Sequence, residues 1–596
     1  MALALIVAVG AALTRGAADA DALLREGGSG VFLFALPAAV VVIGAVVTAR
    51  LLAPAVRRLE RVIPESAIAA RLATLSIARR PGGAAAAAAF LTISVSVAIF
   101  ASAYRATLDR GQRDQAAFAL GADLVVREDL RRLVPVRNVV SQALLEGLGS
   151  EVSAAPVARA AANVASVGTL SGIAVLGLEP PLLESLRGLE LDAPELEVPA
   201  ELTGPRLPRA GRSLTIGGRT SKSGVTLSLV VRGPGGAYER IVVTVPGRAA
   251  VPAAARGGTL LGFQVLPPPR LQERGADAGR PFVAEIELGP VRAGGSTIVD
   301  EYRGWVGLGG ASYRTGRLSV TLSNQVETWF RPRQRLDTVP LPAIVSPPVA
   351  AVADDSRRLT LQLGGRPVRV EVVAIETRFP STRGDFAVVD RAALESALNL
   401  AAPGSGFPTE VWANAATPAA EEAARARLRR APFDALVLDS RVERETTLRE
   451  DPLARGALGM LVLTTGAALL LALLAVALAT LADLRDDRLE LLDLESQGAP
   501  PALLRRLVRL RQLGACVLGL IGGVLTGALL ARLVVEVVSV SAGGEPPLPP
   551  LRLTFDPWLA AAVLFFLGAA AALVVLLATG RAFRTGAAGR PSEVES

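Results

Sequence analysis

The sequence predicts an α-helical membrane protein of about six spans, with a large extracytoplasmic α+β domain that carries an inserted β-sandwich. Composition is the first observation: 51% of the 596 residues are hydrophobic, yet 20% are charged, and the mean hydropathy is +0.43. Apolar stretches long enough to cross a bilayer lie near both ends of the chain. Residues 105–455, between them, show instead the short alternating patterns of strands.

Rare residue types exclude several kinds of chemistry. The chain has no histidine, one cysteine (Cys516) and one lysine (Lys222). Without histidine there is no Ser-His-Asp or Cys-His nucleophile and no imidazole metal ligand. A single cysteine forms neither an internal disulfide nor a thiolate zinc site. Ser221 precedes Lys222, where a Walker A motif needs glycine. We therefore expect no catalytic site, cofactor site, metal site or P-loop in this chain.

Six spans are predicted from apolar stretches of about 20 residues. A transmembrane pair is expected in residues 1–55. Its first span, within residues 1–14, is short, and the alternative is a signal peptide cleaved near residues 18–22. The remaining spans are residues 84–104, 456–482, 513–535 and 557–580.

Because no charged residue lies in the middle of a strong span, proton- or ion-coupled transport is disfavoured.

Arginine placement predicts the orientation of the spans. Three segments are rich in arginine: the amphipathic segment 56–83, the loop 483–512 and the tail 581–596. The positive-inside rule assigns all three to the cytoplasm, which places residues 105–455 outside and both termini inside. The net charge of +8 is explained by these arginines, so no nucleic-acid partner is expected.

The outer region is predicted to consist of an α+β domain interrupted by an insertion. The α+β domain comprises residues 105–165 and 366–455, where strands alternate with short helices. Near the start and the end of the outer region, the expected strands are 122–126, 151–155, 173–178, 368–375, 386–389, 410–413 and 435–439, and the expected helices are 138–148, 181–186, 392–399 and 418–430.

The insertion, residues 166–365, is rich in Gly and Pro and contains runs of strict period two, which predict a β-sandwich or jelly roll. The clearest alternating runs are 225–229, 282–288, 318–322 and 359–363. Trp305, Tyr313 and Trp329 could stack on a sugar, although packing in the core or at an edge is the favoured interpretation.

Two segments resemble FtsX/MacB-like ABC permeases. Residues 72–126 read LATLSIARRPGGAAAAAAFLTISVSVAIFASAYRATLDRGQRDQAAFALGADLVV: a basic amphipathic lead-in, an apolar span, and then Gly121-Ala122-Asp123. Residues 488–527 read RLELLDLESQGAPPALLRRLVRLRQLGACVLGLIGGVLTG. The similarity covers roughly residues 84–165 and 366–580, without the β insertion, and the chain is similar to the C-terminal half of a longer permease.

The resemblance implies a membrane protein of the bacterial plasma membrane that is driven by an ABC ATP-binding subunit in trans. ATP would then be bound by that partner and not by this chain. Membrane lipids and a second permease half, as a homodimer or pseudo-dimer, are further implied partners. The residues in register with the family's ATPase-coupling pattern are Arg488, Glu490, Leu491, Leu494 and Gly498, whereas Asp493 and Gln497 replace residues that are usually apolar.

The residues of the loop 483–512 predict a short helix and its end, independently of the resemblance. Leu491 and Leu494 share one face of a short helix. Gly498 can end that helix in a left-handed conformation, and the prolines at 500 and 501 prevent its continuation. The next stretch, residues 502–510, is amphipathic, and docking on a partner and lying on anionic lipid are both open for it.

Glycines in the span after the loop predict close helix packing. Gly519, Gly523 and Gly527 recur every four residues and therefore lie along one face. An intramolecular contact and a subunit interface are equally compatible with this spacing.

Three functions are compatible with the sequence. The first is a permease that transmits ATPase-driven motion to its outer domain, for export, lipid or lipoprotein handling, or envelope remodelling. The second is a membrane-anchored extracellular binding or adhesion protein without an ATPase. The third, a membrane-embedded enzyme, is least compatible because the chain has no histidine and no charge in the middle of a strong span.

Overall fold

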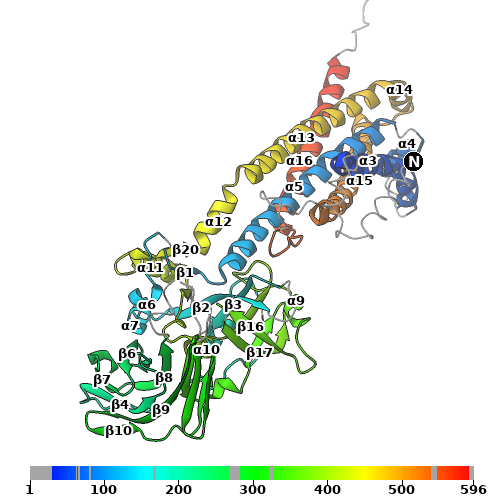
Figure 1. Cartoon of the computed structure of the whole chain (residues 1–596). Helices are drawn as coiled ribbons and strands as arrows, with labels where there is room; N and C mark the ends of the chain where they lie inside the picture. Colours follow the sequence, from blue (N-terminus) through cyan, green and yellow to red (C-terminus); the bar gives the residue numbers. More distant parts are fainter. Residues whose placement is uncertain are drawn as a thin grey trace, which may run out of the picture. The chain divides into compact units, whose positions relative to one another are not determined.

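The chain divides into two compact units, shown in Figure 1. The helical unit comprises Met1–Ala116 and Glu443–Ser596, and the β-rich unit comprises Ala117–Val442. The computed structural model describes residues 30–588, apart from residues 62–63, 65–67, 80–81, 130, 165–169, 190, 192–193, 267–281, 323–326, 365 and 538–546.

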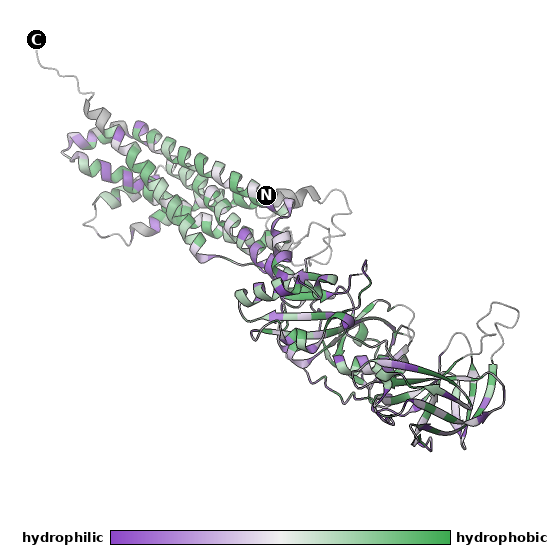
Figure 2. Cartoon of the chain, turned by 90° about the vertical axis from the view of Figure 1, so that its left-hand side faces the viewer, coloured by the Kyte–Doolittle hydropathy of each residue, from purple (hydrophilic) through white to green (hydrophobic). Residues whose placement is uncertain are grey.

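Long apolar helices form the helical unit. Within the described residues, five helices are long and apolar enough to cross a membrane. Hydrophobic colour runs along them in Figure 2. The expected span within residues 1–14 lies outside the described residues. The helices are α3 (Gly30–Glu60), α4 (Ile68–Arg79), α5 (Gly82–Leu120), α13 (Pro452–Asp486), α14 (Arg488–Ser496), α15 (Pro501–Val537) and α16 (Pro557–Ala588), of which α4 and α14 are the short ones.

Glycines allow α15 to pack closely on two neighbours. A Cβ added at Gly523 would lie 2.4 Å from Cβ of Val95 on α5, and Gly519 and Gly527 face the same helix. Gly522 faces Thr48 of α3 instead, with 2.2 Å between an added Cβ and the hydroxyl oxygen. The predicted glycine face is therefore an intramolecular contact in this structure.

The main sheet of the β-rich unit has nine strands in the order β16-β17-β15-β18-β3-β2-β19-β1-β20. β16 also pairs with β2, so six of these strands form a closed circuit. The strands are β1 (Leu124–Arg127), β2 (Val152–Val164), β3 (Ile173–Leu178), β15 (Leu341–Val345), β16 (Arg358–Leu363), β17 (Arg366–Ile375), β18 (Phe386–Asp390), β19 (Glu410–Ala415) and β20 (Val437–Ser440).

Short helices accompany this sheet. Asp390 caps α10, because its carboxylate accepts a hydrogen bond from the amide of Ala393. Thr417 caps α11 in the same way through Ala420. The single helix expected at residues 138–148 is two helices, separated by extended backbone at Val140 and Ser141. The helices are α6 (Val136–Val139), α7 (Gln142–Glu146), α8 (Pro180–Glu184), α9 (Pro347–Ala350), α10 (Arg391–Ala401) and α11 (Pro418–Leu428). The next helix, α12 (Arg441–Arg449), begins in the β-rich unit, and its residues from Glu443 onward belong to the helical unit.

Two further sheets enclose a separate core. One has the order β12-β13-β9-β4-β7, with β10 beside β9, and the other has the order β11-β14-β8-β5-β6. Their buried side chains belong to one hydrophobic cluster, as a sandwich requires. The strands are β4 (Ser213–Thr220), β5 (Thr226–Arg232), β6 (Tyr238–Thr244), β7 (Gly247–Ala250), β8 (Thr259–Leu266), β9 (Phe282–Ala293), β10 (Ser296–Val299), β11 (Trp305–Leu308), β12 (Ala311–Arg314), β13 (Arg317–Leu322) and β14 (Thr328–Pro332).

The two sandwich sheets occupy a shorter range than the 166–365 expected from sequence. Their strands run from Ser213 to Pro332. β3 before them and β15 and β16 after them pair within the nine-stranded sheet. The alternating run at 359–363 is β16, so its assignment to the insertion is corrected. Alternation marks a strand with one buried face, and it does not say which sheet the strand joins.

The aromatic residues considered as sugar platforms pack in the sandwich. The rings of Trp305 and Tyr313 lie 5.1 and 5.0 Å from the ring of Phe330, centroid to centroid. Trp329 is buried. Packing in the core or at its edge, the favoured interpretation, therefore describes all three, with Trp305 and Tyr313 partly buried against the core.

Candidate coupling site

The candidate site is built around α14, the short helix between α13 and α15. α14 ends where Gly498 adopts a left-handed φ of +93°, and the amide of Ala499 donates to the carbonyl of Leu494 at 3.0 Å. This is the bonding of a glycine C-terminal cap. Pro501 then opens α15 at a position where a missing N–H costs nothing. The predicted end of the helix is confirmed.

The structure places all five predicted coupling residues on α14 or at its end. Leu491 and Leu494 are half-buried, so part of each side chain is still accessible, and Gly498 is exposed. Arg488 and Glu490 belong to α14, but their side chains are outside the described part of the structure.

A buried polar network lies at the start of α14. Arg511 of α15 is only 3% exposed. Its guanidinium donates to the hydroxyl of Ser76 at 2.9 Å and to the carboxylate of Asp487, which directly precedes α14. Nε of Arg511 lies 3.3 Å from the carboxylate of Asp483 on α13, and Gln512 also donates to that carboxylate. We call these five residues the Arg511 network.

The Arg511 network connects three helices, α4, α13 and α15, with the start of α14. Ser76 belongs to α4, Asp483 to the last turn of α13, and Arg511 to α15. At the start of α5, a Cβ on Gly83 would lie 2.4 Å from a carboxylate oxygen of Asp483, so a larger residue there would displace that carboxylate. Breaking a buried ion pair by removing one partner costs about 3–5 kcal/mol. The network therefore resists displacement of α14 relative to the helices around it.

Sequence reasoning missed this network. It interpreted Arg511 as an arginine at a membrane boundary, since many arginines flank the spans. Asp483, Asp487 and Arg511 are brought together only by the turn through α14, and no local spacing identifies them. A detectable signal was the acidic pair Asp483 and Asp487, four residues apart, directly after the uncharged stretch 456–482.

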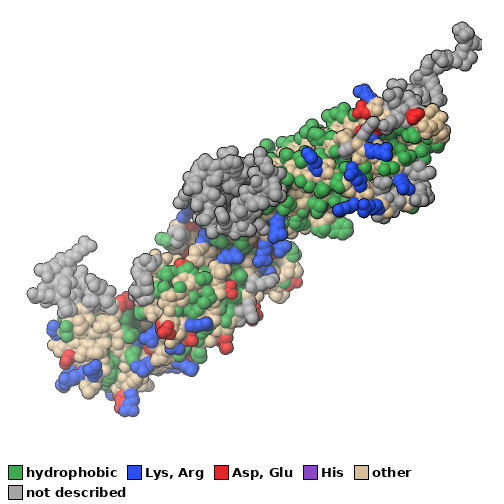
Figure 3. Space-filling view, turned by 90° about the vertical axis from the view of Figure 1, so that its right-hand side faces the viewer, with side chains coloured by type: hydrophobic (Ala, Val, Ile, Leu, Met, Phe, Trp, Pro, Cys, Tyr) green, Lys and Arg blue, Asp and Glu red, His purple; other side chains and the backbone are tan. Residues whose placement is uncertain are grey.

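Arginines also surround this region on the surface. Arg505 and Arg506 near the start of α15 are exposed, as are Arg57 and Arg58 at the end of α3. On the face shown in Figure 3, arginines stand out against the hydrophobic surface of the helical unit. Among the described residues, no group of three or more His, Cys, Asp or Glu residues could hold a metal ion.

No protein-family model matches this chain, and no curated protein matches it significantly.

Proposed function

We propose that this chain is a permease subunit of an ABC transporter of the FtsX/MacB type. It would lie in the bacterial plasma membrane with residues 105–455 outside, and an ATP-binding subunit in trans would bind and hydrolyse ATP. Its work would be export, lipid or lipoprotein handling, or envelope remodelling. The observation that best supports the proposal is α14, a short helix with two accessible leucines that begins at the buried Arg511 network.

The geometry is suited to transmitting a displacement. A force on α14 would act on Asp487 and, through Arg511 and Asp483, on α15 and α13. α13 is one helix of 35 residues, longer than the roughly 20 that cross a bilayer. The chain passes from the helical unit into the β-rich unit through α5. This is one helix of 39 residues that continues to Leu120, within the β-rich unit. Stiff helices of this length can move as rigid elements.

The test changes Leu491 and Leu494, the two leucines of α14 that we propose to contact the ATPase. Leu491→Asp with Leu494→Asp should abolish co-purification of the ATPase, because two leucines would no longer be buried against it. Both side chains are already half-buried in this chain, so the loss is roughly 1.5–3 kcal/mol of contact energy, or on the order of tenfold to a hundredfold in affinity. A pull-down from membranes, with mass spectrometry to identify the ATPase, measures this.

The matched control is Ser496→Asp with Gln497→Asp, which adds the same two charges at exposed positions at the end of α14. The control should retain the ATPase. Equal ATPase recovery from the leucine variant and the wild type would refute docking through α14. If the wild type itself brings down no ATPase, the result favours a membrane-anchored binding protein.

A further inference from the structure

The segment that joins α5 to the β-rich unit has little conformational choice. Gly121 ends α5 with a left-handed φ of +77°, and its amide donates to the carbonyl of Ala117 at 2.8 Å. A Cβ at Gly121 would lie 2.8 Å from the ring of Trp412, so glycine is required by both backbone and packing. Ala122 is fully buried, and Asp123 follows at 1% exposure.

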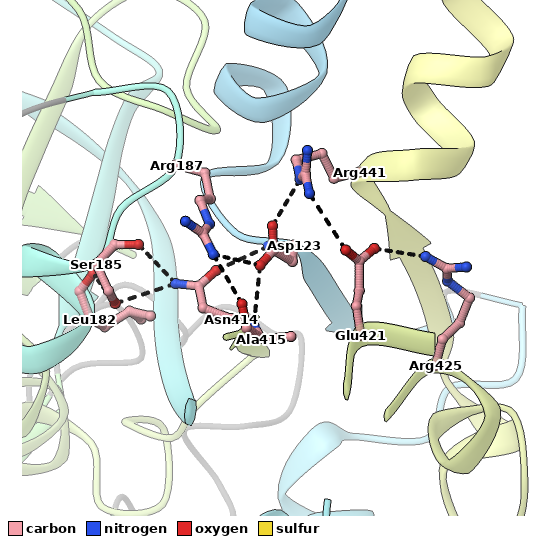
Figure 4. A network of polar contacts seen from close by, with 9 residues as sticks. All are labelled: Asp123, Leu182, Ser185, Arg187, Asn414, Ala415, Glu421, Arg425 and Arg441. Atoms are coloured by element: carbon pink, nitrogen blue, oxygen red, sulfur yellow. Dashed lines mark hydrogen bonds and ion pairs between the residues drawn. The ribbon is translucent and has the colours of Figure 1, made fainter. Parts of the chain in front are cut away.

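Asp123 is the centre of a network of hydrogen bonds and ion pairs, drawn in Figure 4. One carboxylate oxygen accepts from Nε of Arg441 at 2.8 Å. The other accepts from the guanidinium of Arg187 at 2.8 Å and from the amide of Ala415 at 3.1 Å. The amide of Asp123 donates to the side-chain oxygen of Asn414 at 3.0 Å. This buried carboxylate is thus surrounded by donors, two of them positively charged.

Arg441 is held by Asp123 at two points. Besides the side-chain contact, the amide of Arg441 donates to the carbonyl of Asp123 at 2.9 Å. The guanidinium of Arg441 also lies 3.4 Å from Glu421 of α11, and Glu421 in turn pairs with Arg425 at 2.7 Å. Arg441 begins α12, immediately after β20.

β20 needs such support because it is a weakly attached strand. It comprises Val437–Ser440 at one end of the nine-stranded sheet, and β1 is its partner. A short edge strand opens easily, since it has one ladder of hydrogen bonds and little buried surface. Through β20 and α12 the chain leaves the β-rich unit, just as it enters through the end of α5 and β1.

We propose that Asp123 is a positioning residue that fixes Arg441, and with it β20 and the start of α12, to the end of α5. The two points where the chain enters and leaves the β-rich unit then move together. This joint movement of the two points does not depend on a partner protein. Its consequence for coupling rests on the proposed function, because a displacement that arrived on one connection alone would otherwise open the edge of the sheet.

Hydrogen exchange of the full chain in detergent tests the proposal. The variant is Arg441→Gln, which leaves Asp123 paired with Arg187. We expect the amides of β20 to exchange at least about tenfold faster, because a buried charged hydrogen bond is lost. The matched control is Arg127→Gln, which removes a pair joining the same two strands at the surface: Arg127 lies 2.7 Å from Asp439, with both side chains over 40% exposed. The control should change the rate by no more than about fivefold.

Equal exchange rates for β20 in the two variants would overturn the proposal. Faster exchange spread evenly over the nine-stranded sheet would also overturn it, because that pattern marks a general loss of stability. If Arg441→Gln fails to fold, Arg441→Lys, which keeps the charge and one donor, is measured by the same criteria.

A second measurement addresses coupling. Arg441→Gln should retain ATPase co-purification, because α14 is unchanged, and should lose the activity of the complex in cells. Normal activity in cells would remove the coupling role. If no ATPase is recovered even with the wild type, the proposed function fails, and the exchange result is unaffected by that failure.

Discussion

At the scale of single residues, the position of α15 depends on glycines, whose lack of a side chain allows a neighbouring helix to approach closely. Gly519, Gly523 and Gly527 lie against α5, where the hydroxyl of Thr92 donates to the carbonyl of Gly519 at 3.2 Å. Such close approach increases van der Waals contact, on which helix association in lipid depends. The sequence predicted the shared face from the four-residue spacing. It could not distinguish α5 from a second copy of the chain, because spacing describes one helix and says nothing of its neighbour.

Gly523→Leu should therefore destabilise the helical unit. The new side chain would meet Val95 and the carbonyl of Thr92, with 2.4 Å between Cβ atoms where contact needs more than 3 Å. Overpacking of this kind costs about 1–3 kcal/mol, or on the order of 5 °C in the unfolding midpoint. The midpoint in detergent measures it.

Gly466→Leu is the matched control for this substitution. Gly466 lies within the apolar part of α13, and nothing lies within 4 Å of an added Cβ there. This variant should melt like the wild type. If both leucine variants melt together, close packing at Gly523 is not what stabilises the unit.

At the scale of elements, the two chain segments that bound the sandwich are joined to each other. Gln334 accepts from the amide of Thr203 at 2.9 Å and donates to its carbonyl at 2.7 Å. Asp337 holds this turn, because it accepts from the amide of Gln334 at 2.8 Å and from the guanidinium of Arg331 at 2.6 and 2.8 Å. Burial acts to raise the pKa of Asp337, but these hydrogen bonds and the nearby positive charges outweigh burial and lower it below its usual 3.8.

Asp337→Asn should destabilise the protein in a pH-dependent way. A carboxyl whose folded-state pKa is lowered contributes stability above its unfolded pKa, and that contribution is lost as the pH falls through the folded-state value. We expect a loss of roughly 2–3 kcal/mol at pH 7, which shrinks as the pH falls below about 4. Unfolding midpoints at pH 7, 5 and 3 measure it.

Asp300→Asn serves as the reference, because Asp300 is an exposed aspartate of the same sandwich. It should track the wild type at every pH. A difference between Asp337→Asn and the wild type that is constant with pH would show that the hydrogen-bond geometry matters and the charge does not.

Elements with a clear period were predictable, and their partners were not. The strand expected at residues 173–178 is β3, with identical bounds. The alternating run at 318–322 is within β13, in the sandwich, whereas the similar run at 359–363 pairs with β17 and β2 in the other sheet. Both strands bury every second side chain, so their local patterns are the same. Only long-range pairing separates them. The same limit concealed the Arg511 and Asp123 networks.

At the scale of the whole molecule, arginine bias predicts that the β-rich unit lies outside the cell. The single lysine provides a direct test, because Lys222 is exposed in the sandwich and its ammonium lies 5.0 Å from the ring centroid of Phe282. A membrane-impermeant amine reagent applied to intact spheroplasts should modify Lys222, as read by peptide mapping. Lys222→Arg should abolish the label. Modification that appears only after the membrane is permeabilised would place the β-rich unit in the cytoplasm.

The order of the strands determines when each strand of the β-rich unit can pair with its partners during translation. Val125 of β1 pairs with Trp412 and Asp439, and β2 pairs with β19 as well as with β3 and β16. The ribosome must therefore make the whole sandwich before β1 can meet either of its partners, and before β2, which can pair earlier with β3, can meet β19 and β16. At common elongation rates this delay is on the order of 15–60 s. During it, β1 and the part of β2 that pairs with β19 would be open to misassembly, so a nascent chain stalled before β19 should be a preferred substrate for chaperones.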